Sequence, residues 1–375
     1  MLSATRGIGI GSALAVVAAG VMWMAHRGRT QTPARERGAG PAPATENAHL
    51  GSESCSRCHP GEAFRHARSG HARTLAPARK SAAARHLAGS MFRDDQRGIT
   101  FHYRLDEDGL TVTVPERLGD EFFPLDWAFG SGEHATTFLT LIPNRVGETV
   151  GIEHRVSVFA PDHHSGLTPS HAGLEPTQDV EQFGRVIRGP KLEACIGCHT
   201  TSAPAGKAAI LERQANVGCE RCHGPGAPHL QAVEEKRDDL AVLFGRGNHT
   251  AEEQIRLCGQ CHRHPEALSE TRIGSENPRL ARFQPVGLLQ SACYKKSGGQ
   301  MSCTTCHDPH EHVAQQRGEF EGRCVRCHAP DGSQSAPCRV SPAANCIACH
   351  MPEIEVRPGT AFHDHWIRIH AAPGR

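Results

Sequence analysis

The stretch CTTCHDPHEH, residues 303–312, contains two cysteines and three histidines within ten residues. Its first five letters are one copy of the pattern Cys-x-x-Cys-His, which occurs seven times in the chain. These seven copies use 14 of the 16 cysteines, so the fold must be built around them. The copies are CSRCH (55–59), CIGCH (195–199), CERCH (219–223), CGQCH (258–262), CTTCH (303–307), CVRCH (324–328) and CIACH (346–350).

The spacing of each copy is that of covalent haem c attachment. Two cysteines three residues apart can form thioethers with the two vinyl groups of one porphyrin, and the next histidine then ligates the iron. We therefore predict seven covalently attached haems c. The predicted thioether cysteines are Cys55, Cys58, Cys195, Cys198, Cys219, Cys222, Cys258, Cys261, Cys303, Cys306, Cys324, Cys327, Cys346 and Cys349. The predicted proximal ligands are His59, His199, His223, His262, His307, His328 and His350.

Three other readings of the cysteine pairs fit the sequence less well. A zinc ribbon needs two such pairs and no fixed histidine after each. A thioredoxin-like motif occurs once, in a βαβ context. A disulfide framework would not place histidine after the second cysteine in seven copies out of seven.

The composition agrees with a core that side chains alone do not build. Hydrophobic residues make up 38% of the chain and aromatic residues 5%, which is low for a globular domain. Seven porphyrins would supply the missing apolar bulk. The net charge of +1 suggests no nucleic-acid partner.

The N-terminal segment predicts export from the cytoplasm. An apolar run from about residue 7 to residue 25 follows Arg6, and its length lies between a signal peptide and a membrane span. We expect residues 1–26 to be a signal peptide or an N-terminal membrane anchor, and residues 27–50 to be a flexible linker. The predicted location is periplasmic or extracytoplasmic, because haem c is attached outside the cytoplasm.

A strand pattern occupies the long gap between the first two copies of the motif. Apolar and polar residues alternate over residues 99–105 and 110–114, on either side of the turn signal at residues 106–109, which predicts a β-hairpin. Further strand-like runs occur at Thr136–Ile142 and His154–Phe159.

We therefore expect a mainly α-helical and irregular multihaem cytochrome c fold. It would have few long elements, a haem-packed core and a small β-rich insertion at about residues 90–165. The predicted organisation is a first haem segment at 51–79, a β-rich insertion at 80–190 and a six-haem region with a histidine-rich tail at 191–375.

The chain has ample histidine for a second axial ligand on each iron. Outside the leader the methionines are Met91, Met301 and Met351, whereas 19 of the 26 histidines lie outside the motifs. Bis-histidine ligation of low-potential haem is therefore the prediction for most of the irons. His66 competes with His71 for this role, and His312 is a reserve for His310. The distal candidates are His71, His134, His229, His249, His310, His363 and His365.

Two cysteines lie outside the motifs, Cys293 and Cys338. An even number of cysteines outside the motifs of an exported protein suggests a disulfide between these two. A cysteine thiolate as an axial haem ligand remains the alternative.

The sequence around the motifs resembles that of the cytochrome c-554-like group of multihaem cytochromes. The similar segments are CSRCHPGEAFRHARSGHA (55–72), CERCHGPGAPH (219–229), LCGQCH (257–262), SACYKKSGGQMSCTTCHDPH (291–310) and NCIACHMP (345–352). The resemblance implies an exported electron carrier with closely packed haems. It also implies that His71, His229 and His310 occupy distal ligand positions.

Two functions follow from seven haems. The first is an electron-transfer protein that connects redox partner proteins, and we favour it because no flavin, molybdenum or nucleotide motif occurs. The second is a multihaem oxidoreductase acting on a small nitrogen or sulfur compound at one haem with an open axial site.

Overall fold

The computed structural model describes residues 49–370, apart from 145–147, 203–208, 246–248, 330–337, 342–343 and 358–359. The predicted signal peptide or anchor and nearly all of the predicted linker therefore lie outside the described residues. Within the described ranges, no helix has the length and apolar character needed to span a bilayer.

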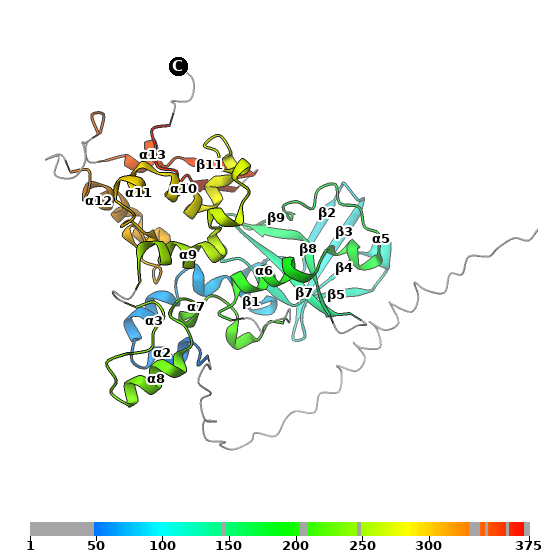
Figure 1. Cartoon of the computed structure of the whole chain (residues 1–375). Coiled ribbons are helices and arrows are strands. Elements are labelled where there is room, and N and C mark those ends of the chain that lie inside the picture. Colours follow the sequence, from blue (N-terminus) through cyan, green and yellow to red (C-terminus); the bar gives the residue numbers. More distant parts are fainter. Residues whose placement is uncertain are drawn as a thin grey trace, which may run out of the picture. The chain divides into compact units, whose positions relative to one another are not determined.

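The predicted β-hairpin is confirmed, and it forms the centre of a four-stranded antiparallel sheet (Figure 1). In its turn, the Asp106 carboxylate accepts a hydrogen bond from the backbone N–H of Asp108 (3.0 Å). Ile99, Phe101 and Tyr103 are buried and alternate with more exposed residues, as expected for a strand with one covered face. The strands, in sheet order, are β2 (Met91–Asp94), β3 (Ile99–Asp106), β4 (Gly109–Thr113) and β5 (Phe122–Leu125).

A second, six-stranded antiparallel sheet surrounds the two longest strands of the protein. The predicted strand-like runs at Thr136–Ile142 and His154–Phe159 lie within these two strands. Gly184 pairs with His154 on the neighbouring strand. Any larger residue at position 184 would collide with this strand, because its Cβ atom would lie 2.0 Å from the carbonyl oxygen of Glu153. The strand order is β1 (Leu75–Pro77), β6 (Trp127–Phe129), β7 (Ala135–Pro143), β8 (Thr149–Phe159) and β10 (Gly184–Ile187), with β9 (His164–Leu167) paired to β8.

One apolar core joins the side chains of both sheets. Phe101 and Val112 come from the four-stranded sheet, and Phe138 and Val156 come from the six-stranded sheet; all four are fully buried. Burial of each such side chain contributes roughly 1.5–3 kcal/mol. This core fixes the two sheets against each other.

The prediction of a mainly α-helical and irregular fold with a small β insertion is wrong. The structure contains 39% helix and 23% strand, distributed over several sheets. The strands begin at Leu75 and continue to Ile187, beyond both limits of the small insertion predicted at about residues 90–165, and a separate hairpin lies near the C-terminus. The strands β1 and β6 have three residues each, which is too short for a period-two pattern to be recognised.

The cysteine motifs lie in short helices separated by loops and tight turns (Figure 1). The α-helices are α2 (Ser52–Ser56), α3 (Pro60–His66), α4 (Ala82–Leu87), α5 (Pro115–Leu118), α6 (Gly189–His199), α7 (Cys219–His223), α8 (Gly226–Glu234), α9 (Ala251–His262), α10 (Gln284–Gln290), α11 (Ala292–Lys296), α12 (Phe320–Val325) and α13 (Cys346–His350). The 3₁₀ helices, most of them single turns, are η1 (His71–Arg73), η2 (Ala78–Lys80), η3 (Asp179–Gln182), η4 (Glu212–Gln214), η5 (Pro265–Ala267), η6 (Glu270–Arg272), η7 (Pro278–Arg282), η8 (Cys303–Thr305) and η9 (Val313–Glu319). The C-terminal hairpin pairs β11 (Glu353–Arg357) with β12 (Thr360–His363).

The polar interior of the β-rich part predicts a pH-dependent stability. The His154 side chain is fully buried, its Nδ1 donates to the carbonyl oxygen of Phe183 (2.7 Å), and its Nε2 accepts from the Tyr103 hydroxyl (2.8 Å). Burial lowers the pKa of His154 to about 3. The unfolded chain, with a His pKa near 6.5, binds more protons in the interval between these values.

The stabilisation from neutral His154 is therefore complete above about pH 6.5 and is lost as the pH falls towards 3. We expect His154→Gln to lower the urea midpoint of unfolding more at pH 7 than at pH 4. The exposed His86 offers a matched control, because His86→Gln should lower the midpoint equally little at both values. Equal losses for His154→Gln at both pH values would contradict the prediction.

Candidate functional site

Each Cys-x-x-Cys-His copy occupies about one helical turn. The backbone N–H of His59 donates to the carbonyl oxygen of Cys55 (2.9 Å), and His307 and Cys303 repeat the contact (2.9 Å). Residues i, i+3 and i+4 of a helical turn share one face. Both sulfurs and the imidazole of a copy therefore lie on one side of the backbone, where a single porphyrin can meet all three.

Four of the predicted proximal histidines face a second imidazole at a constant spacing. Two metal–nitrogen bonds of about 2 Å, with about 1 Å from each nitrogen to its ring centre, would separate two imidazole centres by about 6 Å. The observed pairs match this value, so they fit an iron held between two imidazoles. Their ring centres lie 6.3 Å apart for His59 and His229, 6.2 Å for His262 and His71, 6.1 Å for His223 and His310, and 6.2 Å for His307 and His365.

The hydrogen bonds of these histidines favour ligation through Nε2. In most of them Nδ1 contacts an oxygen atom, which fixes the tautomer and leaves Nε2 for a metal. A backbone carbonyl oxygen accepts from Nδ1 of His71 (Pro309, 3.3 Å), His223 (Phe244, 2.5 Å), His229 (Leu240, 2.8 Å) and His365 (His363, 3.0 Å). The same holds for the proximal His199 (Thr74, 2.9 Å) and His350 (Arg368, 3.0 Å). A side-chain oxygen accepts from Nδ1 of His262 (Gln284, 3.2 Å) and of His310 (Asp308, 2.9 Å).

Burial keeps several of these imidazoles neutral, which is the form that binds iron. Burial lowers the pKa of His199, His262 and His307, and it lowers the pKa of His365 to about 4. These four side chains therefore enter ligation without first losing a proton at neutral pH.

Cysteines of different copies also lie next to each other. The thiols of Cys55 and Cys219 are in hydrogen-bonding contact, which brings the first and third copies together. The same contact joins Cys198 to Cys261, Cys258 to Cys303 and Cys324 to Cys346. The copies are thus close neighbours in space although they are up to 164 residues apart in the sequence, from Cys55 to Cys219.

Two of the three remaining distal candidates have a phenylalanine ring as their neighbour. The His134 ring lies 4.6 Å from that of Phe362, and burial lowers the pKa of His134. The His249 ring lies 5.0 Å from that of Phe244. His363 resembles the paired histidines, because its Nδ1 donates to the carbonyl oxygen of Met351 (2.8 Å).

Two histidines that compete with these candidates have different environments. His312 uses both ring nitrogens, since Nε2 contacts the Glu133 carboxylate (2.7 Å) and Nδ1 accepts from the N–H of Ala314 (3.2 Å). It is therefore poorly suited to replace His310. His66 is buried, and its pKa is lowered to about 4. Burial is the main cause of this shift, and the nearby His71 is the second.

The two remaining cysteines are both free thiols in the structure. Cys293 lies near Cys327 of the sixth copy, and Cys338 lies near Cys346 of the seventh. A disulfide between Cys293 and Cys338 stays a prediction.

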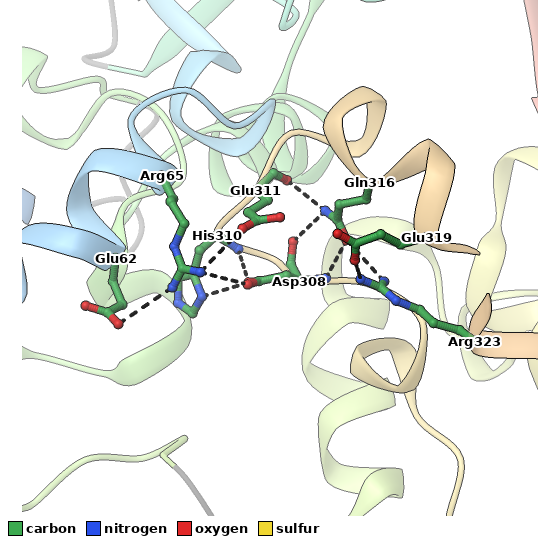
Figure 2. A network of polar contacts seen from close by, with 8 residues as sticks. All are labelled: Glu62, Arg65, Asp308, His310, Glu311, Gln316, Glu319 and Arg323. Carbon is green, nitrogen blue, oxygen red and sulfur yellow. Dashed lines mark hydrogen bonds and ion pairs between the residues drawn. The ribbon is translucent and has the colours of Figure 1, made fainter. Parts of the chain in front are cut away.

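A polar network around His310 was missed at the level of the sequence (Figure 2). The Asp308 carboxylate accepts from both the Nδ1 and the backbone N–H of His310 (2.9 Å each). Arg65 of α3 reaches from the first haem segment to Asp308 (3.6 Å) and Glu311 (3.3 Å). The sequence CHDPH places Asp308 close to His310 along the chain, so this contact could have been recognised locally. No local feature identifies Gln284 as the partner of His262, because the two lie 22 residues apart.

Comparisons with known proteins find multihaem cytochromes among the relatives of this chain. The family described as cytochrome c554 and c-prime matches residues 163–224. The multiheme cytochrome MtrA of Shewanella baltica is 24% identical over 52% of this chain and 62% of its own length. The dissimilatory sulfite reductase MccA of Wolinella succinogenes is 24% identical over 36% of this chain and 22% of its own. The chain thus spans less than two thirds of either relative.

A solved structure has a similar fold over most of the chain. The outer cell wall cytochrome OcwA superposes with a TM-score of 0.51 at 16% sequence identity, and the match covers 86% of this chain and 80% of that one. At this level of identity the likeness concerns the fold alone.

Proposed function

We propose that this multihaem c-type cytochrome holds seven covalently attached haems c and passes electrons between redox partner proteins outside the cytoplasm. The observation that carries the proposal is the set of four imidazole pairs at 6.1–6.3 Å. When bound, each haem supplies an iron that takes up and releases one electron. The residues of the chain hold these irons, set their potentials and keep them close together.

Bis-histidine ligation is the proposed state of most of the irons. His229, His310, His71 and His365 serve as sixth ligands for the haems of the first, third, fourth and fifth copies. His134, His249 and His363 stay the candidates for the second, sixth and seventh. Two imidazoles give a low-potential iron without an open position, as electron transfer requires.

The cysteine contacts support a continuous path through these haems. The first copy contacts the third through Cys55 and Cys219, and Cys222 of the third lies near Cys258 of the fourth. The fourth copy contacts the fifth through Cys258 and Cys303, the sixth contacts the seventh through Cys324 and Cys346, and Cys306 of the fifth lies near Cys327 of the sixth. We propose the order 1-3-4-5-6-7, with the second copy joined to the fourth.

The proposed location is extracytoplasmic, in the periplasm or at the cell surface. It is supported by the attachment chemistry of haem c, by the apolar run near the N-terminus and by the similarity to an outer cell wall cytochrome. Retention of that run would anchor the protein to a membrane; its cleavage would release it.

Haem counting and electron paramagnetic resonance test the proposal together. We expect seven haems per chain in a pyridine haemochrome assay and, in the fully oxidised protein, signals of low-spin haem alone. A count other than seven would refute the haem number. Loss of the low-spin signals in favour of high-spin haem would refute bis-histidine ligation.

A second candidate function is supported by the second copy. In the described part of the chain, the ring contact of His199 is with Phe129 (5.0 Å) and not with another imidazole. One of the relatives is named as a dissimilatory sulfite reductase. An oxidoreductase with one open haem site would show one high-spin haem per chain, and its signal would change on addition of sulfite or nitrite.

A further inference from the structure

The proposed distal ligands differ in the charge of the group that accepts from Nδ1. His71 donates to the carbonyl oxygen of Pro309, whereas His310 donates to the carboxylate of Asp308. The acceptors of His229 and His365 are also backbone carbonyls. One tripeptide, residues 308–310, thus offers a neutral acceptor to one haem and an anionic acceptor to another.

The structure holds the Asp308 carboxylate in this position. Its Oδ1 accepts two hydrogen bonds from His310, through Nδ1 and through the backbone N–H, each at 2.9 Å. The backbone of Asp308 is fixed by Gln316, which accepts from its N–H (2.8 Å) and donates to its carbonyl oxygen (3.0 Å). Pro309 restricts the backbone between carboxylate and ring. Contacts within the chain therefore hold the Asp308 carboxylate in place without the help of the haem.

The nearest cation does not cancel the charge of Asp308. Arg65 lies 3.6 Å from Oδ2, the oxygen that does not contact the imidazole. The same guanidinium contacts Glu311 (3.3 Å) and Glu62 (3.6 Å), so its charge is shared among three carboxylates (Figure 2). The net charge of this group next to His310 is negative.

An anionic acceptor makes an imidazole a stronger electron donor. A carboxylate draws the Nδ1 proton towards itself and raises the basicity of Nε2. Hydrogen bonds of this kind are one of the means by which a protein sets the potential of a haem. A more basic ligand stabilises ferric over ferrous iron and so lowers the potential.

We infer that the Asp308 carboxylate lowers the midpoint potential of the haem attached through Cys219 and Cys222, acting through His310. Asp308 is thus a positioning residue for one haem, which lies between the first and fourth copies in the proposed order. The inference rests on the proposed ligation of that haem by His223 and His310.

The test uses the intact holoprotein in two steps. His310→Ala first identifies the haem, because it should remove one low-spin signal from the oxidised spectrum. A redox titration then follows that signal in Asp308→Asn, whose side-chain amide oxygen can still accept from Nδ1 but carries no charge. We expect the midpoint of this signal to shift to higher potential, with the haem count and the spin states unchanged.

Glu311→Gln is the matched control, because Glu311 contacts Arg65 without an observed contact to the His310 ring. Its shift should be absent or much smaller and in the same direction, since Arg65 would then turn more fully towards Asp308 and offset part of its charge. An unmoved signal in Asp308→Asn would overturn the inference and leave the ligand pair intact. Retention of every low-spin signal in His310→Ala would instead refute the ligand pair and the inference with it.

Discussion

Replacement of His71 by glycine is expected to convert one haem in seven from low-spin to high-spin without loss of any haem. The His71 ring centre lies 6.2 Å from that of His262, the proximal residue of the fourth copy. Glycine removes the sixth ligand but leaves both thioethers and His262 in place. The backbone at this position should persist, because the carbonyl oxygen of His71 accepts from the N–H of Val217 (3.1 Å).

The conversion is measured as a high-spin signal of one haem per chain in the oxidised protein. Added imidazole should fill the vacated position and restore the low-spin spectrum. His312→Gln is the control, since both ring nitrogens of His312 already have protein partners. If His71→Gly retains all low-spin signals, His71 does not ligate iron, and the buried His66 becomes the next candidate.

The imidazole pairs mark the limit of what the sequence could predict at the site. His71, His229, His310 and His365 were recognised as candidates because each follows a motif closely or lies in a histidine-rich tail. Their partners could not be predicted, since His71 pairs with a residue 191 positions away and His59 with one 170 away. Such pairs depend on the packing of separate loops, which leaves no periodic signal in the sequence.

The fold was predictable where a strand was long and covered on one face. The alternation over residues 99–105 predicted β3, and the apolar run in residues 136–142 predicted β7. The insertion predicted at about residues 90–165 missed β1 and β10, which join a sheet whose other strands lie far along the chain. The fold class was therefore wrong because pairing partners, rather than local propensity, decide these short strands.

Replacement of Asp94 by alanine is expected to produce the largest loss of stability in the β-rich part. Asp94 and Arg155 form an ion pair whose side chains are 0% and 1% exposed. The Arg155 guanidinium also donates to the carbonyl oxygen of His171 (2.6 Å) and to the Gln96 side chain (3.3 Å). These neutral acceptors would remain in the variant, but the charge would have no counter-ion.

An uncompensated buried charge of this kind costs about 3–5 kcal/mol. The loss is measured as a decrease in the free energy of unfolding in urea, followed by circular dichroism of the holoprotein at pH 7. The adjacent Asp95 is a close control, because its side chain is 94% exposed and its pair with Arg93 is long (3.6 Å). Asp95→Ala should cost at most about 0.5 kcal/mol, as surface ion pairs do.

The double variant Asp94→Ala with Arg155→Met separates the cost of the stranded charge from the cost of lost packing. Methionine keeps an apolar stem at position 155 and removes the charge, so part of the stability lost in Asp94→Ala should return. A double variant less stable than Asp94→Ala would show instead that the contacts of Arg155 with His171 and Gln96 hold this region together. The buried pair would then matter as a hydrogen-bonding framework for β8 rather than through its charge balance.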